Sequence, residues 1–200
     1  AVHADRIGVC GDSAGGNLAA VAALDARDRG GPKLTAVGLI YPALDFSFAC
    51  ASHRTFASGY LLTAESLAWY RDRYLAGPDR ADDWRASPLR RTDLAGLPEA
   101  YVLTAGYDPL KDEGRVWSER LHAAGVPVTY ECFEGMIHGF ITMGGVIAAS
   151  SHAIIRLAAH LRQGFGLAPP PRPRLRAEGS VAVEAETSDT SGVDHDPQRR

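Results

Sequence analysis

Residues 7–19 read IGVCGDSAGGNLA, and this stretch is the starting point for interpreting the chain. A short apolar run stops at Gly11, and helical spacing of apolar residues begins at Ala14. Residues 11–15 fit the pattern G-x-S-x-G, in which a serine occupies a tight, strained turn between a strand and a helix. The pattern predicts that Ser13 is an exposed nucleophile. It also predicts that the backbone N–H of Ala14, at the helix N-terminus, donates to an oxyanion.

A simpler interpretation is a glycine-rich turn in which Asp12 or Ser13 caps the helix. Short polar side chains favour that position. Glycine accounts for 21 of the 200 residues, so the five-residue pattern alone can arise by chance. The strand before it and the helix after it favour the nucleophile.

The composition is that of a globular domain: 46% of residues are hydrophobic, 22% are charged, and the formal net charge is -3. There is no basic excess, so we expect no nucleic-acid partner. No apolar run approaches the ~20 residues that span a bilayer, so we expect no membrane span. The three cysteines are too few for a disulfide framework and favour a cytoplasmic location. Two of them, Cys10 and Cys132, lie in apolar runs and are expected to be buried.

Strand-like runs alternate with helical patterns, which predicts right-handed βαβ units and a parallel sheet flanked by helices. We therefore expect an α/β domain over residues 1–167, with an insertion at about 53–87. Residues 168–200 are rich in Pro, Arg, Ser and acidic residues, and we expect them to be disordered. The expected strands are residues 7–10, 34–42, 100–106 and 127–133, and the expected helices include residues 14–30, 110–124 and 146–163, with a further helix that begins after Thr63.

A serine nucleophile needs a base, and the base needs an orienting acid. Asp108 follows the third expected strand and His138 follows the fourth. Because the strands are parallel, these residues and Ser13 fall at the same edge of the sheet. The order Ser, Asp, His along the chain is the one expected of an α/β-hydrolase.

Each candidate partner has an alternative role. Asp108 precedes Pro109, which suits a helix N-cap. Asp112 competes as the acid, but it lies one turn into the helix and is expected to face elsewhere.

The other histidines, including His53 in the insertion, have no metal-ligand spacing, and no dinucleotide or phosphate loop is present. We therefore expect no metal and no cofactor.

The chain resembles the hormone-sensitive-lipase family of α/β-hydrolases from about residue 6 to about residue 163. The resemblance implies the C-terminal half of an α/β-hydrolase fold with a partial cap. It implies that Ser13 is the nucleophile, Asp108 the acid and His138 the base, acting on carboxylic esters of small or medium acyl chains without a cofactor. The blocks that carry the resemblance are GDSAGGNLA, YPALD, SPL, LPEAYVLTAGYDPLKDEG, LHAAGVPV and GMIHGF, in that order.

The sequence departs from the family in one respect, because it contains no H-G-G-G block upstream of the serine. It also opens almost directly on a strand and without methionine, so we expect the upstream half to be missing. A weak or inactive remnant, or a ligand-binding protein of the same fold, is therefore the alternative. Acyl transfer and amide hydrolysis also stay open. The last helix and the fourth strand are expected to offer an edge for a homodimer.

Overall fold

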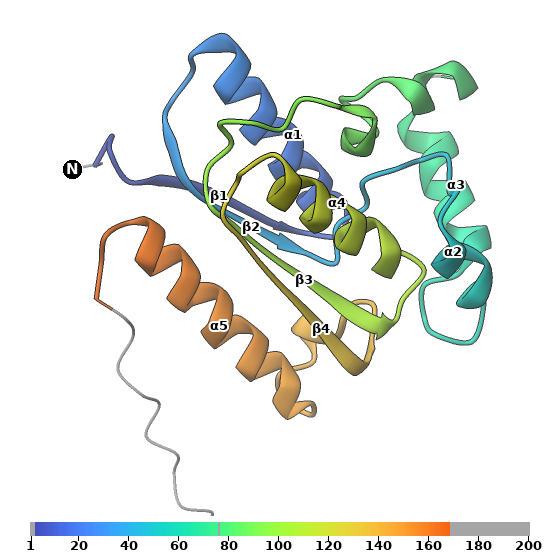
Figure 1. Cartoon of the computed structure of the whole chain (residues 1–200). Helices are drawn as coiled ribbons and strands as arrows, with labels where there is room; N and C mark the ends of the chain where they lie inside the picture. Colours follow the sequence, from blue (N-terminus) through green and yellow to red (C-terminus); the bar gives the residue numbers. More distant parts are fainter. Residues whose placement is uncertain (1–2, 76, 169–200) are drawn as a thin grey trace, which may run out of the picture. The chain divides into compact units, whose positions relative to one another are not determined.

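A four-stranded parallel sheet forms the centre of the computed structural model, which describes residues 3–75 and 77–168 (Figure 1). The strands lie in chain order, and each is parallel to the next. This arrangement confirms the predicted α/β class. The strands are β1 (Ile7–Asp12), β2 (Leu34–Ile40), β3 (Ala100–Tyr107) and β4 (Val128–Ile137).

Helices cover both faces of the sheet. Helices α1 (Ala14–Arg29) and α4 (Lys111–Ala123) pack on one face, and α5 (Ala148–Gly164) packs on the other (Figure 1). Each face has its own apolar core: Leu24 and Trp117 are buried on the first face, and Phe140 and Leu157 on the second. Because helices cover both faces of the sheet, side chains on both faces of β2 and β3 are buried. This explains why these two strands are continuous apolar runs.

The segment between β2 and β3 contains two helices, α2 (Ala51–Thr55) and α3 (Ala64–Tyr74), and two 3₁₀ turns, Pro78–Asp82 and Pro88–Arg90. Both helices lie beyond the end of the sheet toward which the strands point (Figure 1). Thr63 caps α3 in a reciprocal arrangement with Ser66, which confirms the predicted helix start. That residues 53–87 act as a cap stays a prediction. Of the tail predicted to be disordered, residues 169–200 lie outside the described residues.

Strand β4 continues to Ile137, beyond the predicted end at residue 133, so the prediction of a loop there was wrong. The pairing of β3 with β4 is irregular at this point. Ala105 pairs with Phe133 and Tyr107 pairs with Ile137, so three residues of β4 lie opposite the single residue Gly106. A β-carbon on Gly106 would lie 2.0 Å from the carbonyl oxygen of Glu134, so glycine is needed for this close approach.

The prediction that two cysteines are buried was also wrong. Cys10 is exposed and Cys132 is only half-buried. Their strands, β1 and β4, are the outermost two of the described sheet, where side chains are covered less completely than on β2 and β3. Apolar neighbours in the sequence do not reveal which strands will be outermost.

Candidate active site

Ser13 occupies a strained turn between β1 and α1. Its backbone angles are φ 54° and ψ -117°, a conformation that is unfavourable for a residue with a side chain. Three backbone hydrogen bonds hold it there. The Ser13 N–H donates to the carbonyl of Ile40 (2.9 Å), and the Ser13 carbonyl accepts from the N–H groups of Asn17 (3.1 Å) and Ala43 (3.2 Å). The serine side chain makes no capping hydrogen bond to α1, which argues against the capping interpretation.

The turn depends on close backbone contact at Gly11. A β-carbon on Gly11 would lie 2.1 Å from the carbonyl oxygen of Gly15. We therefore expect Gly11→Ala to lower the free energy of unfolding by about 3 kcal/mol or more. Gly15→Ala is the matched control, because its β-carbon would meet nothing closer than 3.9 Å. Urea unfolding followed by circular dichroism measures both, and equal effects of the two substitutions would contradict this account.

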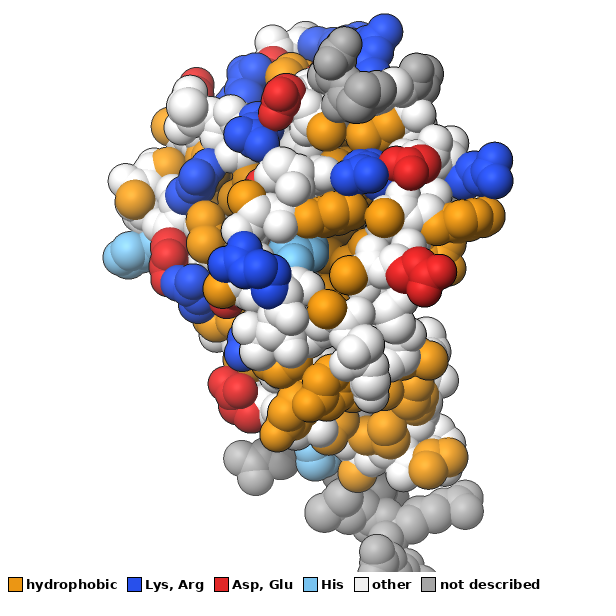
Figure 2. Space-filling view, turned by 90° about the vertical axis from the view of Figure 1, so that its right-hand side faces the viewer, with side chains coloured by type: hydrophobic (Ala, Val, Ile, Leu, Met, Phe, Trp, Pro, Cys, Tyr) orange, Lys and Arg blue, Asp and Glu red, His pale blue; other side chains and the backbone are white. Residues whose placement is uncertain are grey.

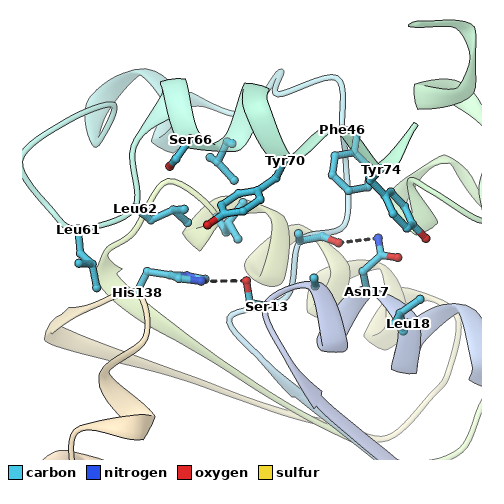
Figure 3. Close-up of a pocket in the computed structure, with 14 residues that line it drawn as sticks. Ser13, Asn17, Leu18, Phe46, Leu61, Leu62, Ser66, Tyr70, Tyr74 and His138 are labelled. Atoms are coloured by element: carbon cyan, nitrogen blue, oxygen red, sulfur yellow. Dashed lines mark hydrogen bonds between the residues drawn. The ribbon is translucent and has the colours of Figure 1, made fainter. Parts of the chain in front are cut away.

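The side chains of Ser13, His138 and Asp108 form a continuous hydrogen-bonded chain. Nε2 of His138 lies 2.9 Å from Oγ of Ser13 (Figure 3). Nδ1 of the same ring lies 2.8 Å from Oδ2 of Asp108. Asp108 is fully buried, and His138 is 9% exposed. The structure therefore brings together the three residues that were predicted to meet.

Asp108 is not the helix N-cap that its place before Pro109 suggested, because α4 begins at Lys111 and its N-cap is Leu110. The other oxygen of Asp108, Oδ1, accepts a hydrogen bond of 2.9 Å from the N–H of Leu110. Asp108 therefore fixes the turn before α4 with one oxygen and faces His138 with the other. The competing carboxylate, Asp112, accepts instead from the N–H of Ser52 (2.9 Å).

Strand register sets the separation of the acid and the base. Tyr107 on β3 is paired with Ile137 on β4, and Asp108 and His138 are the residues that immediately follow this pair. Asp108 and His138 are 30 positions apart in the sequence, and the hydrogen-bonded pairing of β3 with β4 places them together.

Tyr41 packs against the ring of His138. The ring centroids are 4.4 Å apart, and Tyr41 is fully buried at the end of β2. Its N–H donates to the carbonyl of Leu103 (2.6 Å), which fixes its position. Burial raises the pKa of the Tyr41 phenol, and the nearby carboxylates Asp12 and Asp108 add to this effect. Tyr41 therefore presents a neutral surface that limits rotation of the imidazole.

The N–H of Ala14 is the candidate oxyanion donor. Ala14 is the first residue of α1, and the first N–H groups of a helix have no acceptor within it. The positive end of the helix dipole favours negative charge at the same place. Ala14 is exposed and lines the same cavity as Ser13.

A cavity of about 610 Å³ lies above Ser13 and His138. Most of its wall is apolar or aromatic and comes from α1, the loop after β2 and residues 61–74. Several of these side chains are exposed, including Leu18, Tyr70 and Tyr74. Figure 2, viewed from the side of α2 and α3, shows hydrophobic side chains exposed among charged ones on this face of the molecule. Among the described residues that form the cavity wall there is no Asp, Glu, Lys or Arg, so the wall favours an uncharged, apolar ligand.

The sequence analysis missed a buried carboxylate, Glu113, that supports this cavity. Glu113 accepts hydrogen bonds from the N–H groups of Leu44 and Asp45, the second at 2.9 Å, and from Nε2 of His53 at 2.5 Å. Burial raises the pKa of Glu113, and its three hydrogen-bond partners oppose that shift. The contact joins α4 to α2 and to the loop after β2. The only available signal was an acidic residue near the start of a helix, which ordinarily lies on the surface.

Removal of the Glu113 side chain is expected to destabilise the fold. Glu113→Ala leaves two buried N–H groups and His53 without their acceptor, at a cost of about 3 kcal/mol. Glu113→Gln retains an acceptor and nearly the same shape, so its cost is expected to be smaller. Chemical denaturation of both variants tests this, and an equal loss in the two would show that the carboxylate charge itself is required.

Asn17 is a second supporting residue that the sequence analysis did not single out. It is buried, and its amide donates to the carbonyls of Ala43 (2.7 Å) and Ala86 (2.6 Å). It therefore ties α1 to the loop after β2, which lines the cavity, and to the loop that contains Ala86.

Among residues 3–75 and 77–168, no group of three or more His, Cys, Asp or Glu side chains is arranged to hold a metal ion. No helix in this part of the chain is long and apolar enough to cross a membrane. The cytoplasmic location and the homodimer stay predictions.

A serine on a strained strand-to-helix turn, followed along the chain by its acid and its base, defines the α/β-hydrolase class. The family model described as "alpha/beta hydrolase fold" matches residues 1–142. The chain belongs to this family, which confirms the predicted fold.

Similar proteins bear esterase names. The carboxylic ester hydrolase LipN of Mycobacterium tuberculosis is 40% identical over 165 residues, covering 78% of this chain and 44% of LipN. Ethyl acetate hydrolase of Pseudomonas putida is 34% identical, covering 81% of this chain and 51% of that protein. The crystal structure of EstE1, a thermostable carboxylesterase from a metagenomic library, superposes with a TM-score of 0.79 at 40% identity, covering 82% of this chain and 56% of EstE1. These similarities confirm the resemblance to the hormone-sensitive-lipase family. The chain spans about half the length of the curated relatives it matches.

Proposed function

We propose that the chain carries the reacting residues of a serine-dependent carboxylic ester hydrolase. The observation that carries this proposal is the hydrogen-bonded chain from Ser13 through His138 to the buried Asp108, at the base of an apolar cavity. The proposed substrate is a small uncharged ester. The names of the similar proteins support the same reaction.

In the proposed mechanism, Oγ of Ser13 attacks the ester carbonyl while Nε2 of His138 takes its proton. A bond forms between Oγ and the carbonyl carbon, and the carbonyl oxygen becomes an oxyanion next to the N–H of Ala14. The bond to the alcohol oxygen then breaks, and His138 returns the proton to that oxygen. Water, activated by the same imidazole, hydrolyses the acyl-enzyme and releases the acid.

Asp108 has a positioning and electrostatic role in this scheme. By accepting from Nδ1–H of His138, it keeps Nε2 free of a proton and directed at Ser13. It also stabilises the imidazolium that forms during each proton transfer. No metal or cofactor takes part in these steps.

A fluorophosphonate probe tests the proposal directly, because it reacts with a serine that has an activating base. We expect one adduct, located on Ser13 by mass spectrometry, and none in Ser13→Ala. Hydrolysis of p-nitrophenyl butyrate provides the turnover measurement. An adduct on Ser66, the other serine that lines the cavity, would contradict the assignment.

The same experiments address the alternative of a ligand-binding protein. Such a protein needs the cavity but has no use for a strained serine bonded to an imidazole. Ligand binding without an adduct at Ser13, and without ester turnover, would favour that alternative.

A further inference from the structure

The backbone at Leu61, in the wall of the cavity, is strained. Leu61 has φ 69°, and the N–H of Leu62 donates to the carbonyl of Tyr60 at 2.9 Å, which closes a three-residue turn around it. A turn of this kind with positive φ at its centre is rare and unfavourable for leucine. Strain of this kind, kept in a wall of a proposed active site, calls for a functional reason.

The strained turn is anchored to the strand that carries the acid. The ring of Tyr60 stacks on that of Tyr107, with centroids 5.2 Å apart and planes 18° apart. Tyr107 is the residue immediately before Asp108. The stacking therefore holds the turn at Leu61 in place relative to the reacting residues.

Leu61 lies at the His138 end of the cavity. One of its methyl groups lies 3.7 Å from where a β-carbon on Gly139 would be, and 67% of the residue is exposed. Figure 3 shows Leu61 beyond His138, whereas Leu18 on α1 lies on the opposite side of Ser13. Both leucines line the same cavity.

The chemistry assigns different parts of an ester to these two sides. The alcohol oxygen must receive its proton from Nε2 of His138, so the alcohol group has to extend toward the His138 side of Ser13. The oxyanion points to the N–H of Ala14. The acyl chain takes the remaining direction, toward α1.

We propose that Leu61 selects the alcohol part of the substrate, and that the site accepts esters of apolar alcohols on this side. Leu18, across Ser13, contacts the acyl chain. This inference rests on the proposed ester hydrolysis and adds to it a residue that determines specificity.

The test compares Leu61→Ala with Leu18→Ala, a matched change at a second exposed leucine (57%) of the same cavity. Two substrate series are used: acetates of ethanol, butanol and hexanol, and ethyl esters of acetic, butyric and hexanoic acids. For Leu61→Ala, we expect the kcat/KM ratio of hexyl to ethyl acetate to fall by about threefold to tenfold, because an apolar contact with the longer alcohol is lost. For the same variant, the kcat/KM ratio of ethyl hexanoate to ethyl acetate is expected to stay as in the wild type. Leu18→Ala is expected to give the reverse pattern.

Two results would overturn the inference: Leu61→Ala changes the acyl series as much as the alcohol series, or it changes neither ratio. Failure of the proposed function has a different signature. In that case the wild-type chain hydrolyses neither series, or hydrolysis persists in Ser13→Ala.

Discussion

Replacement of Ser13 by alanine is expected to lower kcat for ester hydrolysis by about 10⁶-fold. The reason is geometric, since Oγ of Ser13 is the only nucleophilic atom within hydrogen-bond reach of Nε2 of His138 in the described part of the chain. His138→Ala should cause a loss of similar size. Initial rates with p-nitrophenyl butyrate, corrected for the uncatalysed reaction, measure both.

The double variant provides a stricter test. Because the serine and the imidazole act as one unit, removing both should cost no more than removing either one. Losses that multiply in the double variant would show that the two residues act independently. Circular dichroism spectra of the three variants control for unfolding.

Asp108→Asn is expected to lower kcat by about 10⁴-fold while leaving the fold intact. Asparagine can present an N–H to Nδ1 of His138 in place of a carboxylate oxygen. The imidazole then carries its proton on Nε2, the atom that must accept the proton of Ser13. The change also removes the negative charge that stabilises the imidazolium.

Asp112→Asn is the matched control for this prediction. Asp112 lies one turn further along the chain and accepts a hydrogen bond from Ser52 rather than from His138. An asparagine oxygen can still accept that bond, so activity should change by less than about threefold. A large loss in Asp112→Asn together with a small loss in Asp108→Asn would exchange the roles of the two carboxylates.

The reacting residues could be predicted from the sequence because each follows a recognisable strand. Ser13 stands in a turn with a local pattern, and the parallel order of the strands places Asp108 and His138 at the same sheet edge. The choice between Asp108 and Asp112 also rested on local geometry, because only the first lies before the helix begins. These inferences need no knowledge of distant contacts.

The supporting contacts could not be predicted in the same way. Glu113 meets His53 across 60 positions of sequence, and neither residue has a neighbourhood that differs from a surface helix or loop. The exposure of Cys10 depends on which strand is outermost, which is a property of the whole sheet. The extension of β4 depends on how it pairs with β3 around Gly106, a contact between strands that the sequence of β4 alone does not show.

The pairing of Tyr107 with Ile137 has a consequence for changes in chain length. Side chains alternate between the two faces of a strand, so the loss or gain of one residue within β4 would turn every later side chain to the opposite face. His138 would then point away from the serine. Insertions and deletions should accordingly be excluded from the ten residues of β4, where a single missing residue would be more damaging than most substitutions.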